Sequence, residues 1–200
     1  PAYVHGADHY ATKLVGVHEG NPERGLPTVN AQIALTDART GLPKAFMAGT
    51  TITNARTGCI GAVSVRKLAP DPDGEDLTLG VLGAGTQARW QTRVNCVPKT
   101  LPASFATTAA KRSPYSTVAT LADVRIHSPS DSRTACAADL SAEGIPARAV
   151  DTSRAAVEGA DVVVTATTAT EPVFPSDALE AGSLVVAVGA FTAEMQELDP

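Results

Sequence analysis

The chain has 200 residues, enough for one large domain or two small ones, and 44% of them are hydrophobic, which is ordinary for an α/β protein. The formal net charge of -5 disfavours non-specific binding to nucleic acid, and no apolar run approaches the ~20 residues of a membrane-spanning helix. The 3 cysteines are far apart and predict free thiols, with neither a metal site nor a disulfide framework.

The first third of the sequence is predicted to be rich in β-structure. Residues 12–17 and 29–35 are strand-length runs of apolar and β-branched side chains. Turn-forming sequence separates these runs at 19–25 and follows them at 36–41, and residues 45–48 then have the pattern of a returning strand. A hairpin is the simplest assembly of these runs.

A helix is expected over residues 52–68, because apolar side chains recur there at roughly helical spacing. Thr53 or Asn54 is the expected N-cap, since both side chains can accept a hydrogen bond from a free N–H of the first turn. Residues 70–76 are polar and contain two prolines. We therefore place a domain boundary in this connector, between residues 1–70 and residues 77–200.

Strand and helix signals alternate along the rest of the chain. Strands are predicted at 77–82, 122–127, 162–166 and 184–188, and helices at 86–93, at 132–140, up to about 161, and at 175–180. This alternation predicts an α/β fold with a Rossmann-type, doubly wound parallel sheet. Residues 94–120 interrupt it with three prolines, no acidic residue and no clear period, so we expect an atypical insertion there.

A glycine-rich turn stands where the first Rossmann strand is predicted to end. The sequence Gly83-Ala84-Gly85-Thr86-Gln87-Ala88 follows the strand at 77–82 and opens a helix. Gly83 permits the tight turn, Gly85 lets the backbone approach a pyrophosphate, and the small Ala88 keeps the helix close to the sheet. The helix N-terminus then offers free N–H groups to the phosphates. This context predicts a dinucleotide site, with an unrelated glycine-rich turn as the alternative.

The end of the second Rossmann strand is where such folds contact the adenosine ribose. Ser128, Ser130 and Arg133 stand there, in place of the acidic residue that favours NAD. Two hydroxyls and a guanidinium suit a 2′-phosphate, so we expect NADP(H), with NAD(H) as the second choice. In the alternative, residues 128–131 are only a helix cap and Asp131 reaches the ribose.

Several stretches, in order along the chain, resemble the ornithine cyclodeaminase/μ-crystallin family. They are residues 12–15, 21–22, 25–28, 37–41, 52–58, 83–88 and 159–161. The resemblance runs along nearly the whole chain except residues 94–120. It implies a two-domain enzyme, usually a dimer, in which residues 1–70 are part of an α+β substrate and dimerisation domain and residues 77–200 are an incomplete Rossmann domain.

The resemblance also implies roles for individual residues. Lys13 and Arg56 match the positions that hold the substrate carboxylate, which an arginine can bind bidentately. Thr28 matches a position near the cofactor. Thr165, Ala166 and Thr167 are expected beside the nicotinamide ribose, and Val188 and Gly189 are also expected to bind the cofactor.

Phe191 departs from the pattern of the family's cyclodeaminases, which carry an acid–base Asp at that place. A phenyl group cannot transfer protons. We therefore expect an NAD(P)H-dependent reductase of small α-imino acids, of the Δ1-pyrroline-2-carboxylate type, in which Lys13 or a bound water supplies the proton. Ornithine cyclodeaminase (ornithine to proline plus ammonia), alanine dehydrogenase, and a non-catalytic binding protein or inactive fragment stay open as alternatives.

The two ends of the chain lie inside the family's usual length. The sequence starts at Pro1, without a Met and without a basic start or an apolar signal segment. We expect a fragment of a cytoplasmic protein, homodimeric at full length, that binds a small amino or imino acid and neither nucleic acid nor a membrane.

Overall fold

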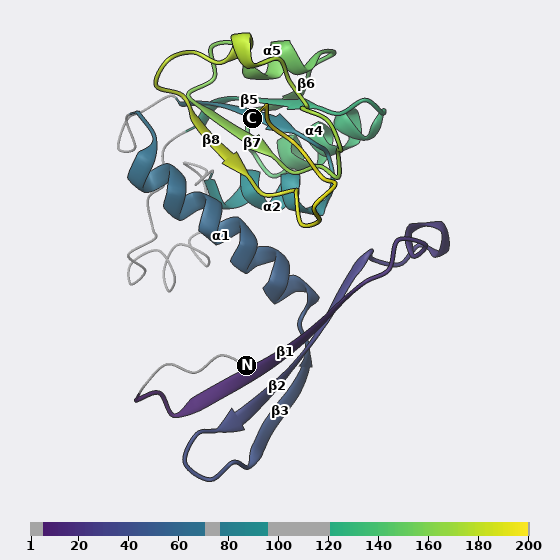
Figure 1. The fold of residues 1–200 in the computed structure, drawn as a ribbon, viewed down its shortest axis with the longest axis vertical. Helices are drawn as coiled ribbons and strands as arrows, with labels where there is room; N and C mark the ends of the chain where they lie inside the picture. Colours follow the sequence, from purple (N-terminus) through teal and green to yellow (C-terminus); the bar gives the residue numbers. More distant parts are fainter. Residues whose placement is uncertain (1–5, 71–76, 96–120, 200) are drawn as a thin grey trace. The chain divides into compact units, whose positions relative to one another are not determined.

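The structure, a computed structural model, describes residues 6–70, 77–95 and 121–199. Two compact units divide the chain, Pro1–Arg56 and Thr57–Pro200, and Figure 1 labels the elements of each. Over the described ranges, the first unit holds a three-stranded antiparallel sheet and the second a five-stranded parallel sheet. This confirms the predicted α/β class. Within the same ranges, no helix is long and apolar enough to cross a membrane.

The sheet of the first unit is a meander in the order β1-β2-β3. Its strands are β1 His9–Val17, β2 Val29–Asp37 and β3 Pro43–Ala48. Lys13 pairs with Ile33, and Ile33 pairs with Met47 on the other side. The predicted strands and their hairpin connections are therefore confirmed, and each strand extends beyond its predicted limits because hydrogen bonding continues into the polar turns.

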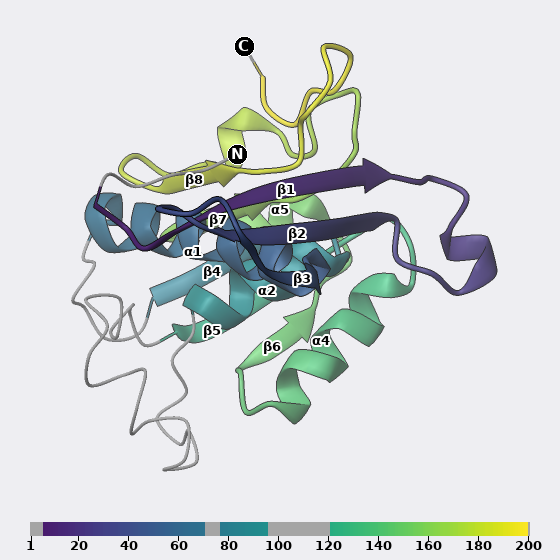
Figure 2. The ribbon, with the colours of Figure 1, turned by 90° about the horizontal axis from the view of Figure 1, so that it is seen from below.

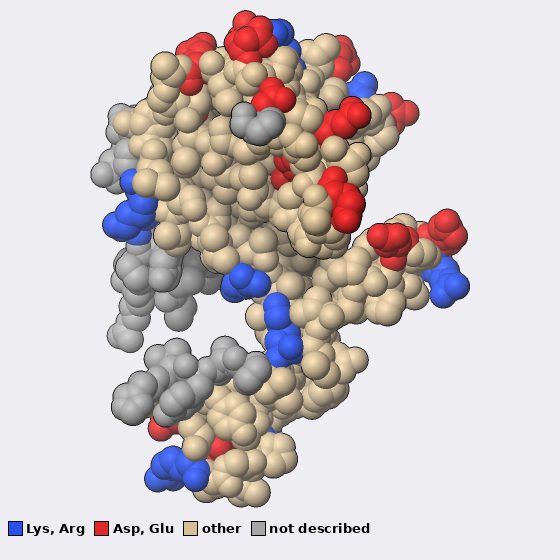
Figure 3. All heavy atoms as spheres, in the orientation of Figure 1, with Lys and Arg blue, Asp and Glu red and all other residues tan. Residues whose placement is uncertain are grey.

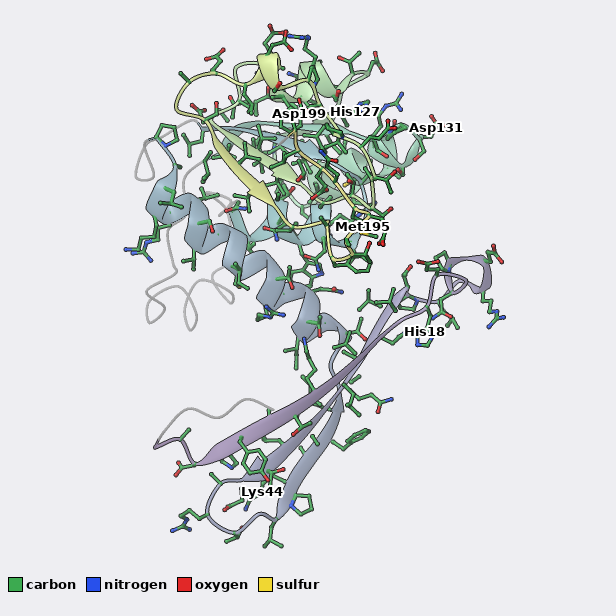
Figure 4. The ribbon with its side chains drawn as sticks, in the orientation of Figure 1. His18, Lys44, His127, Asp131, Met195 and Asp199 are labelled. Atoms are coloured by element: carbon green, nitrogen blue, oxygen red, sulfur yellow. The ribbon has the colours of Figure 1, made fainter. Side chains whose placement is uncertain are left out.

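The turn between β2 and β3 is organised by the carboxylate of Asp37. Its Oδ1 accepts hydrogen bonds from the N–H groups of Arg39 (3.0 Å) and Thr40 (2.9 Å), and its Oδ2 lies 3.3 Å from Lys44 Nζ. Figure 4 labels Lys44 in this sheet. These contacts, the N–H of Thr40 above all, lower the pKa of Asp37 from 3.8 to about 2.

We expect an NMR titration of the Asp37 carboxyl to show a midpoint of about 2. Because the folded-state pKa is the lower one, the stability that this turn gains from Asp37 is fully present above the unfolded pKa of 3.8 and is lost as the pH falls through about 2. Lys44→Ala should leave the midpoint low, because the backbone N–H of Thr40 is the larger cause. A midpoint at the ordinary value in the native protein would contradict the assignment.

The helix α1, Thr50–Leu68, begins earlier than its predicted cap. Thr53 and Asn54 lie inside the first turns, so the N-cap prediction is wrong. The Thr53 hydroxyl instead donates to the carbonyl of Gly49 (2.8 Å), four residues back, as threonine does inside helices. The hydroxyl of Thr50 accepts from Ala31 N–H of β2 (3.0 Å), which fixes the start of the helix to the sheet of the first unit.

The division between the two units falls within α1, whereas the sequence placed a boundary in the connector at 70–76, of which residues 71–76 lie outside the described residues. The reason is the small-residue face of the later turns of α1. A Cβ on Gly58 would lie 3.0 Å from the carbonyl oxygen of Trp90, and one on Gly61 would overlap the Gln91 side chain. The helix α2, Thr86–Asn95, therefore packs closely against the part of α1 that belongs to the second unit.

The sheet of the second unit has the strand order β6-β5-β4-β7-β8, with all pairs parallel. Its strands are β4 Leu77–Leu82, β5 Leu121–His127, β6 Ala147–Ala149, β7 Val162–Thr165 and β8 Leu184–Ala187. The order reverses at β4, which has β5 on one side and β7 on the other. This is the Rossmann arrangement, and its ligands bind at the carboxyl ends of the strands beside the reversal.

Apolar side chains of alternating strand residues build a core on each face of this sheet. Besides α1 and α2, the helices are α4 Ser132–Ala142 and α5 Ser153–Val157, with 3-10 turns η1 Pro22–Arg24 and η3 Ser176–Ala178. Figure 2 shows α4 beside β6 at one edge of the sheet. Two predictions need correction: the helix at 175–180 is a single 3-10 turn, and residues 94–95 continue α2. Residues 96–120 of the predicted insertion lie outside the described residues.

Ion pairs connect α2 to α4 along the surface. Arg89 lies 2.7 Å from Asp139, and Arg93 lies 2.6 Å from Glu143 and lowers the pKa of that carboxyl by a hydrogen bond. Exposed pairs of this kind contribute little stability individually. Together, the two pairs restrict rotation of α2 relative to α4. Acidic side chains are spread over the face of this unit that Figure 3 shows, in line with the net charge of -5.

Candidate cofactor site

The glycine-rich turn lies where three strands of the parallel sheet end. Gly83 has a φ of 108°, a conformation that side chains rarely adopt, and its N–H donates to the carbonyl of His127 at the end of β5 (2.8 Å). A Cβ at Gly83 would lie 2.6 Å from the carbonyl oxygen of Ala166, just after β7. Only glycine therefore fits at this position, where the chain passes between the ends of β5 and β7.

The start of α2 follows this turn directly. A Cβ built on Gly85 meets nothing within 4 Å, so the space in front of the first N–H groups of the helix is open. Ala88 is fully buried and lets α2 lie close to the sheet. The guanidinium of Arg89 donates to the carbonyl of Ala84, which fixes the turn from behind. A helix N-terminus that opens on such a space is suited to phosphate.

A cleft of about 740 Å³ opens at this point. It is lined by residues 82–85 of the turn, by residues 127–129 and Ser132 after β5, and by residues 166–169 and 171–173 after β7. Its walls thus come from the carboxyl ends of the three central strands, where the strand order reverses. This is the position at which doubly wound sheets bind their ligands.

The cleft brings together part of the predicted cofactor set. Gly83, Ala84, Gly85, Ser128, Ala166 and Thr167 line it. The other predicted residues of the second unit do not line it; they are Thr86, Gln87, Ala88, Ser130, Arg133, Thr165, Val188 and Gly189. Sequence reasoning missed lining residues of two kinds. Leu82, His127, Pro129, Ser132 and Thr168 are each next to a predicted residue, whereas Ala169 and residues 171–173 are not.

Three serines and an arginine interact in the segment that follows β5. Ser132 Oγ lies 2.7 Å from Ser130 Oγ and 3.3 Å from Ser128 Oγ. The guanidinium of Arg133 donates to the carbonyls of Ser128 (3.1 Å) and Ser130 (3.2 Å). Its NH2 lies 3.6 Å from the exposed carboxylate of Asp151. Of these residues, Ser128 and Ser132 line the cleft, and the guanidinium of Arg133 is bonded to the turn that carries them.

Asp131, labelled in Figure 4, stands at the N-cap of α4, but its side chain makes no capping hydrogen bond. The alternative of a helix cap over residues 128–131 agrees with this position, and a contact of Asp131 with the ribose stays a prediction. His127 is half-buried and its Nδ1 lies 3.3 Å from the carbonyl oxygen of Val150. The end of β5 is in this way joined to the residue that follows β6.

A buried carboxylate, Glu197, lies behind the wall that follows β7. It is 3% exposed and accepts hydrogen bonds from Thr165, Thr167 and Gly189, which joins the ends of β7 and β8. Sequence reasoning singled out these three donors and missed their acceptor. No local signal marks Glu197, because it lies 30 residues from Thr167 in the sequence.

The predicted substrate residues belong to the first unit. Lys13 is exposed on β1, and its Nζ donates to the Thr53 hydroxyl on α1 (3.4 Å). Arg56 is exposed one turn further along α1. Within the part of the chain that the structure describes, neither cation forms an ion pair. Thr28 precedes β2, and its carbonyl accepts from His18 N–H (2.8 Å).

Comparison with known proteins gives matches along the whole chain. A model of the "Ornithine cyclodeaminase/mu-crystallin family" matches residues 1–97 and 103–200. A Δ1-pyrroline-2-carboxylate/Δ1-piperideine-2-carboxylate reductase of Azospirillum brasilense is 36% identical over 94% of this chain and 52% of its own length. The chain spans about half the length of the curated relatives it matches.

Two solved structures are similar to this one. The Δ1-pyrroline-2-carboxylate reductase of Thermococcus litoralis, in complex with NADH and L-proline, has a TM-score of 0.77 and 31% identity over 94% of this chain and 52% of its own. An archaeal alanine dehydrogenase dimer with bound NAD has a TM-score of 0.75 and 28% identity over 96% of this chain and 52% of its own.

The family match corrects one expectation about the segment at 94–120. Sequence reasoning expected the resemblance to stop over this whole range. The family model instead includes residues 94–97 and 103–120, and leaves out only residues 98–102. Most of the segment is therefore matched by the family model.

Proposed function

The chain belongs to the ornithine cyclodeaminase/mu-crystallin family, and from this premise we propose that it is part of a nicotinamide-dinucleotide-dependent reductase of small α-imino acids. The observation that carries the proposal is the cleft at the carboxyl ends of β4, β5 and β7, bounded by the turn at Gly83–Gly85 and the N-terminus of α2. Named relatives that reduce Δ1-pyrroline-2-carboxylate support the choice of substrate class.

The residues of the cleft fit a dinucleotide. The open space at Gly85 admits a group as close to the backbone as a pyrophosphate must come, and the α2 N–H groups would hold it. Ser128 would face the adenosine ribose, and Ala166 and Thr167 would lie along the nicotinamide half. When bound, the reduced cofactor supplies a hydride to the imine carbon, and a proton goes to the imine nitrogen.

For the cofactor we propose NADP(H), with NAD(H) as the alternative. The wall after β5 offers the hydroxyls of Ser128 and Ser132, with Arg133 bonded to the same turn, and Ser128 stands where NAD-specific folds carry a carboxylate. The similar structures contain NADH and NAD. Those ligands are the reason to measure both cofactors side by side.

For the substrate we propose that Lys13 and Arg56 bind the carboxylate, and that Lys13 or a bound water provides the proton. Both side chains are exposed cations without an ion pair among the described residues, so their charges are available to a ligand. Phe191 is 63% exposed and has no proton to exchange, which favours simple reduction over cyclodeamination. We further propose that the whole protein is a cytoplasmic homodimer.

The test uses the complete gene product, with oxidation of NADPH and of NADH followed separately in the presence of Δ1-pyrroline-2-carboxylate. We expect turnover, faster with NADPH. Arg56→Ala should lower kcat/KM by about a hundredfold, because a bidentate charge-assisted contact is lost. Arg66→Ala, which removes the same group from a later turn of α1, is the matched control and should leave kcat/KM within about twofold.

Two results would contradict the proposal, one for the reaction and one for the role of Arg56. Ammonia released from ornithine in the presence of NAD, with no imine reduction, would instead make the protein a cyclodeaminase. Equal turnover in wild type and Arg56→Ala would remove Arg56 from the substrate site, whatever the reaction.

A further inference from the structure

Glu197 carries one of the few buried charges of the second unit, in a stretch without helix or strand. Its Oε1 accepts from the N–H (2.6 Å) and the hydroxyl (2.8 Å) of Thr167. Its Oε2 accepts from the Thr165 hydroxyl (2.9 Å) and the Gly189 N–H (2.8 Å). Each carboxylate oxygen thus receives two hydrogen bonds, so the buried group is well satisfied without a cation.

The donors come from the segments that shape the cleft. Thr165 ends β7, Thr167 lines the cleft, and Gly189 follows β8. The carbonyl of Glu197 also accepts from the N–H of Val173 (3.0 Å), a further lining residue. A Cβ on Gly189 would lie 2.5 Å from the nitrogen of Thr167, so the close approach of these segments requires glycine. One residue therefore holds both ends of the wall after β7.

The chemistry of the contact requires a carboxylate. Two of the four donors are main-chain N–H groups, one bound to each oxygen. A main-chain N–H can only donate, so it needs an acceptor opposite it. A glutamine has the same shape but presents an NH2 group in place of one oxygen, so one N–H would face another donor. Within residues 6–70, 77–95 and 121–199, no Lys, Arg or His forms an ion pair with Glu197, so its role is as an acceptor and not as the partner of a cation.

We propose that Glu197 is a positioning residue of the cofactor cleft. It fixes the turn at residues 165–169 and the end of β8 before a dinucleotide arrives, so binding does not have to order that wall. The inference rests on the proposed function, since it concerns the same cleft. The proposal adds Glu197 as a residue that contacts the cleft wall after β7 without lining the cleft itself.

The experiment compares the complete protein with its Glu197→Gln variant in two measurements. Amide hydrogen exchange at Thr167 and Gly189 should accelerate by about tenfold or more, because one charge-assisted bond is lost and another N–H faces a donor. The Kd for NADPH and for NADH, from fluorescence titration, should rise by about tenfold. In steady state, the KM for the nucleotide should rise while the KM for the imino acid stays within about twofold.

Glu194→Gln is the matched control. It removes the same charge from the same stretch, but Glu194 is exposed and outside the cleft, so exchange and Kd should stay at wild-type values. Thr165→Val is a second variant that keeps the carboxylate and removes one hydroxyl donor. It should raise the nucleotide Kd by about threefold, and it decides the matter if Glu197→Gln does not fold.

Unchanged nucleotide Kd values in both Glu197→Gln and Thr165→Val, in a wild type that binds the cofactor, would overturn the positioning role alone. A wild type that binds neither nucleotide would instead overturn the proposed function, and with it the cofactor role of Glu197. The two failures are therefore distinguished by the wild-type titration.

Discussion

Gly80→Ala is expected to lower the free energy of unfolding by about 3 kcal/mol, at the upper end of what overpacking a core costs. Gly80 is buried in β4, the central strand of the parallel sheet. A Cβ there would overlap the carbonyl oxygen of Ala156 on α5 and lie 3.1 Å from its carbonyl carbon. Both obstacles are backbone atoms, so relief requires a shift of α5 away from the sheet, and not a change of rotamer.

Urea unfolding followed by circular dichroism measures this loss, with Gly20→Ala as the control. Gly20 lies in an exposed turn and a Cβ there meets nothing within 4 Å, so its replacement should change stability by about 0.5 kcal/mol or less. If Gly80→Ala lost no more than the control, α5 would have to pack less closely on β4 than the structure has it. A shift of α5 would also open the core that Val157 and Val163 share.

The elements that could be predicted from the sequence have a clear hydrophobic periodicity or are bounded by a turn-forming residue such as glycine or proline. Buried parallel strands such as β4 and β7 are short apolar runs bounded by turn residues, and such runs are recognisable locally. The strand β6 was missed because Ala147–Ala149 has only three residues and carries an arginine. Its pairing with β5 is decided by tertiary packing against α4.

The start of α1 was missed for a related reason. Threonine and asparagine are favoured N-cap residues, so the helix was predicted to begin at Thr53 or Asn54. In the structure, the Thr50 hydroxyl receives a hydrogen bond from β2, and Thr53 satisfies its own hydroxyl within the helix. A contact with a strand nineteen residues away in sequence thus decides where the helix begins. Local propensity does not contain that information.

The same distinction separates the predicted from the missed parts of the candidate site. The Gly83–Gly85 turn could be found because its chemistry is local: a strand, a tight turn and a helix start in consecutive residues. Glu197 could not, because its carboxylate is defined by donors 8, 30 and 32 residues away. Its four contacts exist only once β7 and β8 lie side by side.

Gly85→Val is expected to raise the Kd for the dinucleotide by at least about a hundredfold, because the side chain would occupy the space that a pyrophosphate needs and displace it from the α2 N–H groups. The fold should tolerate the change. A Cβ at Gly85 meets no atom within 4 Å, so the cost in stability is that of a poorer N-cap, about 1 kcal/mol or less. Fluorescence titration with NADPH and NADH, beside thermal unfolding of the free protein, measures both quantities.

Gly83→Ala is the matched contrast, since it lies two residues earlier in the same turn. Its φ of 108° strains any side chain, and its Cβ would lie 2.6 Å from the Ala166 carbonyl oxygen, so this variant should lose about 2–3 kcal/mol of stability as well as affinity. Gly85→Val should lose affinity alone. An unchanged Kd in Gly85→Val, in a protein that still binds the dinucleotide, would move the phosphates away from the start of α2. Comparable losses of stability in both variants would mean that the space at Gly85 is closed, and that the turn is rigid at both glycines for structural reasons.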